Sequence, residues 1–328
     1  MKLVIVLRHP FELWNSPAWL SSRIHADFPT VEAVQHSSYH GIEDDLREAE
    51  VVVAWSLRPE QFAMARKLRW IHSPAAAVHQ LMFPELVNSD VILTNSSEVH
   101  GGVVAEHVLA LILALAKRLP QAAHFQLKHV WGQEALWLGR PRPREIDDAT
   151  LGLVGLGGIG RRVAKSASAL GMRVIAVREH PGKEAPEGVQ RVFAPAQLDE
   201  LLSQSDFVVL ATPVTRSTTG LMDAARLGKM KSDAYLINVG RGPLVDEIAL
   251  AQALRDQKIG GAALDVFDEE PLPADSPLWD LENLFITPHT AGITEKLWDR
   301  HYAFITENLR RYLDGRPLLG AVDKRQGY

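Results

Sequence analysis

The chain has 328 residues, no cysteine and a formal net charge of −5. Because a single hydrophobic core rarely extends beyond about 250–300 residues, this length predicts two domains. The acidic balance disfavours a nucleic-acid partner. The lack of cysteine excludes disulfides, thiolate catalysis and cysteine-ligated metals.

Two apolar segments bear on location. The first, Leu3–Leu7, is too short for the core of a signal peptide and is typical of a strand. The longest, Val108–Ala116, is about half the length of a membrane span. We therefore expect a cytoplasmic protein with no membrane partner.

The first third of the chain alternates short apolar runs with amphipathic segments, which is typical of β-α units. A helical pattern runs from about Val103 to Lys117 and stops before Pro120, and residues 121–150 have weak periodicity, as in an arm or subunit contact. The strands predicted here are Leu3–Leu7, Val51–Ala54, Trp70–Ser73 and Val91–Thr94.

From Leu151 the alternation becomes regular. Six predicted strands separated by helical segments match a doubly wound parallel sheet, so the predicted class is α/β. The strands are Leu151–Gly155, Val174–Val177, Phe207–Leu210, Tyr235–Asn238, Ala262–Leu264 and Leu284–Ile286, and the clearest helices are Ile159–Leu170, Ile248–Asp256 and Glu295–Leu313.

A glycine-rich turn joins the first of these strands to a helix. Its pattern, G-x-G-x-x-G, is weak alone but is specific between a strand and a helix. Gly155 permits the tight turn, Gly157 admits a pyrophosphate, and Gly160 allows close packing of helix on strand. The amides opening the helix at Gly158 and Ile159 favour an anion. We predict a dinucleotide site.

Arg178 follows the second strand, 23 residues after Gly155, where a carboxylate usually meets the adenosine ribose. A guanidinium there can pair with a 2′-phosphate, which favours NADP. NAD stays open as an alternative, because Glu179 is one residue away and can serve the ribose instead.

Three loops with charged or titratable residues follow the later strands. They contain Arg241, the acidic run Asp265–Glu270, and His289. Since the carboxyl ends of parallel strands lie at one edge of the sheet, these side chains should converge beside the cofactor. Histidines 100 and 107 share a helical face but have no carboxylate motif beside them, so we predict no metal site.

At this point the chain resembles the D-isomer-specific 2-hydroxyacid dehydrogenases over nearly its whole length. The matching segments are VAEHVLALILALAKR (104–118), LGLVGLGGIGRRVA (151–164), TPVTRSTTGLM (212–222), INVGRGPLVDEIALAQAL (237–254), ALDVFDEEPLP (263–273) and TPHTAGIT (287–294).

The resemblance implies a role for each matching position. Arg241, Glu270 and His289 correspond to the catalytic residues. His289 would donate a proton to the carbonyl oxygen of a 2-oxo acid, Glu270 would fix its tautomer, and Arg241 would hold the substrate carboxylate. Further cofactor contacts are implied at Thr212, Pro213, Thr218, Val239 and, for the nicotinamide carboxamide, Asp265.

The substrate loop departs from the family. Ala75, Ala76 and Ala77 stand where the family has a glycine-containing loop that binds the substrate carboxylate. A pocket of a different shape is therefore an alternative. Trp298 is a second candidate for the pocket wall.

The resemblance also implies the domain plan. A smaller, flavodoxin-like substrate domain comprises residues 1–98 and 291–328, and a Rossmann nucleotide domain comprises residues 99–290. The active site is expected between them. Residues 103–150 resemble the family's dimerisation region, which predicts a homodimer.

Several functions are compatible with this fold. The preferred one is an NAD(P)H-dependent 2-oxo acid reductase, such as a glyoxylate or hydroxypyruvate reductase. A nucleotide-sensing co-repressor is the alternative from another class. Formate dehydrogenase relatives have glutamine where this chain has Glu270, and a phosphoglycerate dehydrogenase with a regulatory tail is disfavoured because the chain ends soon after its last predicted helix.

Overall fold

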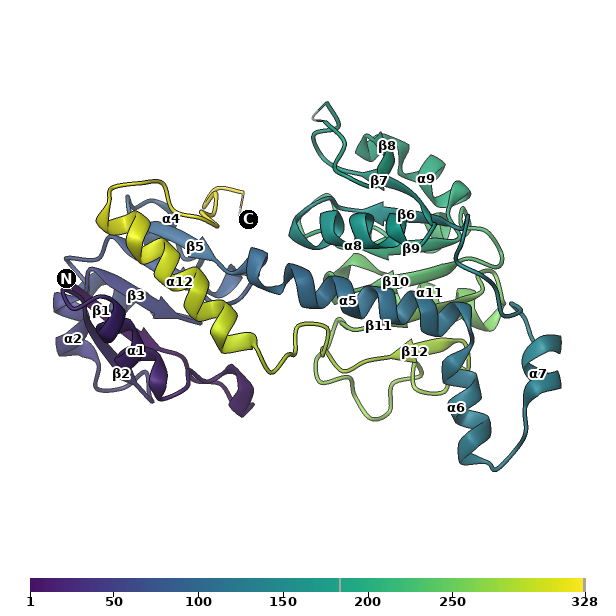
Figure 1. The fold of residues 1–328 in the computed structure, drawn as a ribbon, viewed down its shortest axis with the longest axis horizontal. Helices are drawn as coiled ribbons and strands as arrows, with labels where there is room; N and C mark the ends of the chain where they lie inside the picture. The colour runs from purple at the N-terminus through teal and green to yellow at the C-terminus, as the bar shows by residue number, and fades with distance from the viewer. Residues whose placement is uncertain (183, 327–328) are drawn as a thin grey trace. The chain divides into compact units, whose positions relative to one another are not determined.

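The computed structural model describes residues 1–182 and 184–326, and it divides into two compact units. One unit consists of Met1–His100 with Thr294–Tyr328, and the other of Gly101–Ile293. Each unit has its own sheet, of five and seven strands, and every strand pair is parallel (Figure 1). The predicted α/β class is therefore confirmed.

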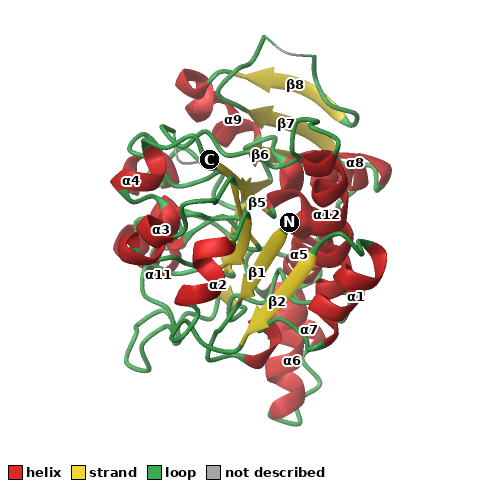
Figure 2. Ribbon diagram, turned by 90° about the vertical axis from the view of Figure 1, so that its left-hand side faces the viewer, coloured by secondary structure: helices red, strands yellow, loops and turns green. Residues whose placement is uncertain are grey.

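In the first unit the strand order is β2-β1-β3-β4-β5. Leu3, Ile5 and Val53 face the apolar sides of α1 and α12, whereas Val4, Val52 and Ile71 face α2, α3 and α4. Figure 2 shows these two groups of helices on opposite sides of the strands. The strands are Lys2–Val6 (β1), Glu32–His36 (β2), Val51–Ala54 (β3), Trp70–Ser73 (β4) and Ile92–Asn95 (β5), and the helices are Trp19–Asp27 (α1), Glu43–Glu48 (α2), Pro59–Met64 (α3), Pro84–Val87 (α4) and Leu297–Leu313 (α12).

In the second unit the order is β12-β11-β10-β9-β6-β7-β8. Helices α5 and α8 pack on one face of this sheet, and α9, α10 and α11 pack on the other. The strands are Thr150–Val154 (β6), Arg173–Val177 (β7), Val189–Phe193 (β8), Phe207–Leu210 (β9), Tyr235–Asn238 (β10), Gly261–Leu264 (β11) and Leu284–Ile286 (β12). The helices are Ser97–Ala116 (α5), Leu119–Leu127 (α6), Gln133–Leu138 (α7), Gly158–Ala169 (α8), Leu198–Gln204 (α9), Ala224–Leu227 (α10) and Glu247–Arg255 (α11).

Each sheet has one strand that the sequence did not predict, β2 and β8. Both are edge strands. β2 is only partly buried, and Gln190 and Arg191 of β8 are exposed. An edge strand faces solvent along one side, so its apolar pattern is weak.

The strand order of the second unit reverses between β6 and β9. β6 pairs with β7 on one side and with β9 on the other, and the chain then proceeds outward through β10, β11 and β12. In an open parallel sheet, ligands bind at the carboxyl edge where the order reverses. This places the phosphate loop and the three charged loops at the same edge.

Helix α5 is the one helix of the described chain that is long and apolar enough to cross a membrane by length and composition. Val104, Val108, Leu111, Ile112 and Leu115 of this helix belong to the core of the second unit. Packing against the sheet therefore accounts for its apolar character.

Residues 119–138 form two short helices, α6 and α7, where the sequence indicated weak periodicity. Pro120 lies in the first turn of α6, where a backbone N–H would have no partner within the helix, so its absence breaks no hydrogen bond. Pro120 therefore begins one helix and also marks the end of the preceding one. Large apolar side chains of this segment are exposed, including Leu127 at 82% and Trp131 at 90%.

Candidate active site

The three glycines of the phosphate loop have different roles. Gly155 has φ +106°, and a Cβ there would lie 2.5 Å from the Ala211 carbonyl oxygen. A Cβ at Gly160 would lie 2.1 Å from the Gly155 oxygen. Around Gly157, by contrast, no heavy atom of the described chain lies within 4 Å of a Cβ position, apart from those of its own chain neighbours. Packing therefore requires the first and third glycines, and the second leaves the backbone open.

This open backbone lies at the N-terminus of α8, whose first residues are Gly158 and Ile159. The first amides of a helix have no partner within the helix and attract an anion. The loop therefore fits the pyrophosphate of a dinucleotide.

Arg178 follows β7 directly. Its guanidinium donates hydrogen bonds to the carbonyl oxygens of Pro181 (3.4 Å) and Glu184 (3.1 Å), which orient it at the end of the strand. The neighbouring Glu179 and His180 are exposed. A cationic group thus occupies the position after the second strand, as the sequence indicates.

The loop after β9 contains Thr212, Pro213 and Thr218. The Thr218 hydroxyl donates to the Pro213 carbonyl oxygen (2.7 Å) and accepts from the Thr215 amide (2.7 Å), so it closes the loop on itself. Val239, after the adjacent β10, is buried, and its amide donates to Leu210 (3.3 Å). These residues lie at the carboxyl edge beside the phosphate loop.

His289 and Glu270 form a hydrogen-bonded pair. The Nδ1 atom of His289 lies 2.6 Å from Oε2 of Glu270, and the other carboxylate oxygen accepts from the Phe267 amide at 2.9 Å. The His289 side chain is 49% exposed, so the imidazole is accessible to a ligand. The carboxylate is fixed by its own loop and in turn orients the imidazole.

The backbone of His289 has φ +52°, a conformation that non-glycine residues adopt rarely. Asp265 supports it: the buried carboxylate accepts from the Thr287 hydroxyl (2.6 Å) and from the amides of Thr290 (2.9 Å) and Ala291 (3.0 Å). The His289 amide donates to the Asp265 carbonyl (2.9 Å). Asp265 therefore organises the whole histidine loop.

His107 on α5 lies behind this carboxylate. Its Nε2 is 3.1 Å from the Thr287 hydroxyl and 3.6 Å from Oδ1 of Asp265. The sequence alone predicts no role for His107. It lies 158 positions from Asp265, and only the folded chain brings the two together.

Arg241 stands on the loop after β10. Burial lowers the pKa of its guanidinium, and the charge of nearby Glu270 opposes that shift. A Cβ at Gly242 would lie 2.0 Å from the Phe267 backbone, so the arginine loop and the acidic loop are in direct contact. The structure thus brings Arg241, Glu270 and His289 together at one edge of the second unit.

The predicted substrate loop lies in the first unit, after β4. The carbonyl oxygen of Ala75 accepts from the Ser96 amide (3.1 Å), and that of Ala76 accepts from the Asn95 side chain (2.7 Å). The amides of Ala76, Ala77 and Val78 donate to no other residue of the described chain. None of the alanines has a positive φ, so alanine fits here without strain.

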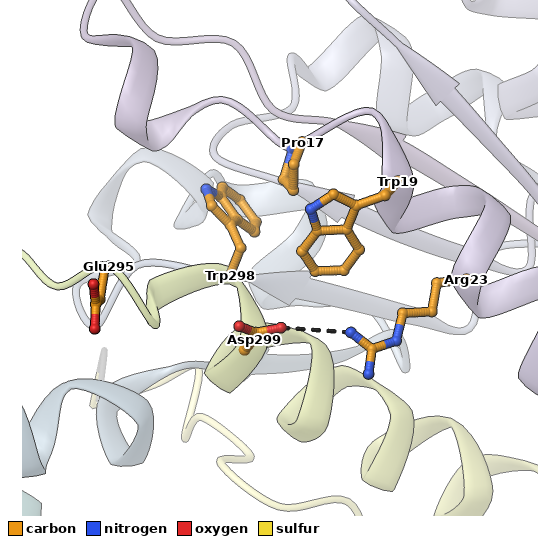
Figure 3. Close-up of a pocket in the computed structure, with 6 residues that line it drawn as sticks. All are labelled: Pro17, Trp19, Arg23, Glu295, Trp298 and Asp299. Atoms are coloured by element: carbon orange, nitrogen blue, oxygen red, sulfur yellow. Dashed lines mark hydrogen bonds and ion pairs between the residues drawn. The ribbon is translucent and has the colours of Figure 1, made fainter.

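Trp298 lines a pocket of about 510 Å³ in the first unit (Figure 3). Its indole N–H donates to the Leu13 carbonyl at 2.8 Å, which fixes the ring. Across the pocket, the Arg23 guanidinium lies over the Tyr302 ring, 4.2 Å from its centroid, and pairs with Asp299 at 3.4 Å. The other lining residues are Pro17, Trp19 and Glu295.

Among residues 1–182 and 184–326, no group of three or more histidine, aspartate or glutamate side chains could hold a metal ion.

A family model described as "D-isomer specific 2-hydroxyacid dehydrogenase, NAD binding domain" matches residues 109–291, more than half of the chain. The chain therefore belongs to the D-isomer specific 2-hydroxyacid dehydrogenases and is an oxidoreductase that acts on CH–OH donors with a nicotinamide cofactor. This confirms the resemblance seen in the sequence.

Individual relatives act on different acids. The (S)-sulfolactate dehydrogenase of Chromohalobacter salexigens is 41% identical over 229 residues, covering 70% of this chain and 72% of the relative. The glyoxylate reductase of Korarchaeum cryptofilum is 35% identical over 263 residues, covering 78% and 76%. The chain spans about half the length of the D-3-phosphoglycerate dehydrogenases that it matches.

Among solved structures, the NADPH-dependent glyoxylate/hydroxypyruvate reductase of Sinorhizobium meliloti, in complex with NADP and sulfate, has a TM-score of 0.82 and 29% identity. The match covers 100% of both chains. At this identity the relative supports the same fold over the full length.

Proposed function

We propose that this dehydrogenase reduces a small 2-oxo acid with NADPH, with glyoxylate and hydroxypyruvate as the first candidates. The observation that carries the proposal is the 2.6 Å contact between His289 and Glu270 beside the partly buried Arg241. A proton donor, its orienting anion and a carboxylate-binding cation are the groups that this reduction requires.

When bound, the nicotinamide cofactor would supply the hydride that reduces C2 of the substrate. His289 supplies the proton: because Glu270 occupies Nδ1, the Nε2–H is the donor directed at the carbonyl oxygen. Glu270 stabilises the imidazolium before transfer and holds the ring in position afterwards. Arg241 binds the substrate carboxylate and polarises the carbonyl with its planar fork.

The test is a panel of 2-oxo acids, each offered with NADPH and with NADH, and followed by nicotinamide absorbance. Glyoxylate and hydroxypyruvate are the expected substrates. Sulfopyruvate belongs in the panel because a relative at 41% identity is named (S)-sulfolactate dehydrogenase. Tight cofactor binding without turnover of any acid would favour the nucleotide-sensing alternative.

For the cofactor, we propose that Arg178 pairs with the 2′-phosphate of NADP. A charge-assisted hydrogen bond contributes about 1.5–3 kcal/mol, or roughly 10- to 100-fold in affinity. Arg178→Ala should weaken NADPH by that factor and leave NADH nearly unchanged. Arg173→Ala is the matched control, because Arg173 lies at the opposite end of β7. An unchanged NADPH affinity in Arg178→Ala, together with preference for NADH, would instead favour Glu179 on the ribose.

We also propose a homodimer formed through the segment that follows α5. Its exposed apolar side chains, Leu127 and Trp131 among them, would be covered by a second copy. A Leu127→Ser, Trp131→Ser double variant should be monomeric by light scattering. Ile248→Ser, which changes an 85% exposed side chain on α11, is the control and should stay dimeric. A wild type that is itself monomeric would refute the proposal.

A further inference from the structure

A continuous chain of hydrogen bonds crosses the interior of the first unit. The Trp70 indole N–H donates to the Thr94 hydroxyl (2.8 Å), which lies 2.8 Å from Nδ1 of His72. The Ser96 hydroxyl lies between the two histidines, 3.1 Å from Nε2 of His72 and 3.2 Å from Nδ1 of His301. All five side chains are 0% exposed.

The protons of this chain can be placed consistently. An indole can only donate, so Thr94 accepts from Trp70. In the tautomer in which His72 carries its proton on Nε2, Thr94 donates to Nδ1 of His72, His72 donates to Ser96, and Ser96 donates to Nδ1 of His301. Each hydroxyl is then used once as donor and once as acceptor.

Both histidines are neutral. Burial lowers the pKa of His72 to about 3, and burial with the nearby His100 and His72 holds the pKa of His301 well below its usual value. The aromatic rings of Trp298 and His100 pack on His301, with centroids 5.2 and 5.3 Å away. The arrangement is thus fixed by packing over the pH range in which enzymes work.

The chain ends at the substrate loop. The Ser96 amide donates to the Ala75 carbonyl oxygen (3.1 Å), and the adjacent Asn95 side chain donates to that of Ala76 (2.7 Å). With these carbonyls bound from one side, the amides of Ala76 and Ala77 have no partner in the described chain. Two adjacent amides without a partner are available to donate hydrogen bonds to a carboxylate.

We propose that His301 is a positioning residue for substrate binding, acting through Ser96 to hold residues 75–77 with their amides directed at the substrate carboxylate. The inference rests on the proposed function, because it takes a 2-oxo acid as the ligand of these amides. It explains how a loop of alanines performs a task for which the family uses glycine. The loop is held from behind by a buried side-chain network.

The test compares His301→Asn with His301→Gln. The amide oxygen of asparagine occupies about the position of Nδ1 and can still accept from Ser96, whereas the longer glutamine presents its amide near the position of Nε2. Both variants lose the same ring contacts. His25→Gln, an exposed histidine on α1, is the matched control.

One neutral hydrogen bond contributes about 0.5–1.5 kcal/mol, which is roughly 2- to 12-fold. His301→Gln and Ser96→Ala should raise the KM for the 2-oxo acid by about this factor, while kcat and the dissociation constant of NADPH change less than about twofold. His301→Asn and His25→Gln should stay within about twofold of wild type. The amides of residues 75–78 should exchange hydrogen faster in His301→Gln than in His301→Asn.

An unchanged KM and unchanged exchange in both His301→Gln and Ser96→Ala would overturn the proposal. Equal effects in His301→Asn and His301→Gln would also overturn it, because the role would then be packing alone. If the wild type reduces no 2-oxo acid, the proposed function fails, while the exchange comparison still decides whether His301 holds the loop.

Discussion

Replacing Asp265 by asparagine tests how the histidine loop is held. The carboxylate accepts four hydrogen bonds: three on Oδ1, from the Thr287 hydroxyl and from the amide and hydroxyl of Thr290, and one on Oδ2, from the Ala291 amide. Asparagine keeps one oxygen for the first three but places an NH₂ group against the Ala291 amide, donor against donor. One charge-assisted bond is lost and a buried N–H has no partner, so the free energy of unfolding should decrease by about 1.5–3 kcal/mol.

For a unit of this size, 1 kcal/mol corresponds to about 2–4 °C in Tm, so Asp265→Asn should lower Tm by about 3–12 °C. Differential scanning calorimetry of the protein without ligands measures this directly. Asp268→Asn is the control, because Asp268 is an exposed carboxylate three positions later. It should change the free energy of unfolding by less than about 0.5 kcal/mol. Equal Tm values for the two variants would refute the role given to Asp265.

Three further predictions concern charged groups. Glu270→Gln removes the anion that stabilises the imidazolium, so the pH above which reduction declines should move lower; an unchanged pH–kcat profile would argue against the pair. Arg241→Lys keeps the charge but loses the planar fork of the guanidinium. The resulting decrease in kcat/KM should correspond to a loss of about 2–4 kcal/mol of transition-state stabilisation. An effect on cofactor affinity alone would show that the role given to this loop is wrong. Lys2 lowers the pKa of Asp45 below 3.8, so Asp45 stabilises the protein above that pH and the contribution is lost as the pH falls. Asp45→Asn should therefore be less stable than wild type at neutral pH and equal to it in strong acid, and a difference that persists in acid would contradict the ion-pair origin.

The parts of the fold that the sequence predicts are those with local causes. The strand, glycine turn and helix of the phosphate loop follow one another within about 20 residues, so the pattern and its context are read together. The edge strands β2 and β8 have no such signal, because they are exposed along one side and contain Glu32, Gln190 and Arg191. Likewise, the sequence indicates that Pro120 ends a helix but does not reveal that it begins another.

The proposed catalytic residues could be predicted from the loops after successive strands, whereas the residues that hold them in place could not. Asp265 is expected from the sequence to contact the nicotinamide, whereas the structure also places its carboxylate under the loop of His289. His72, Ser96 and His301 are neighbours in the interior of the first unit, but they lie up to 229 positions apart in the sequence. Contacts over that distance depend on how two sheets and their helices pack, which no local pattern contains.

We propose that His289 supplies the proton in 2-oxo acid reduction, and His289→Asn is the most direct test of this role. Asparagine adopts the positive φ of this position readily, so the loop should keep its conformation. With the best 2-oxo acid of the panel and saturating NADPH, kcat should fall by roughly 10²- to 10⁴-fold while the dissociation constant of NADPH stays within about twofold. Turnover close to that of the wild type would remove His289 from the mechanism.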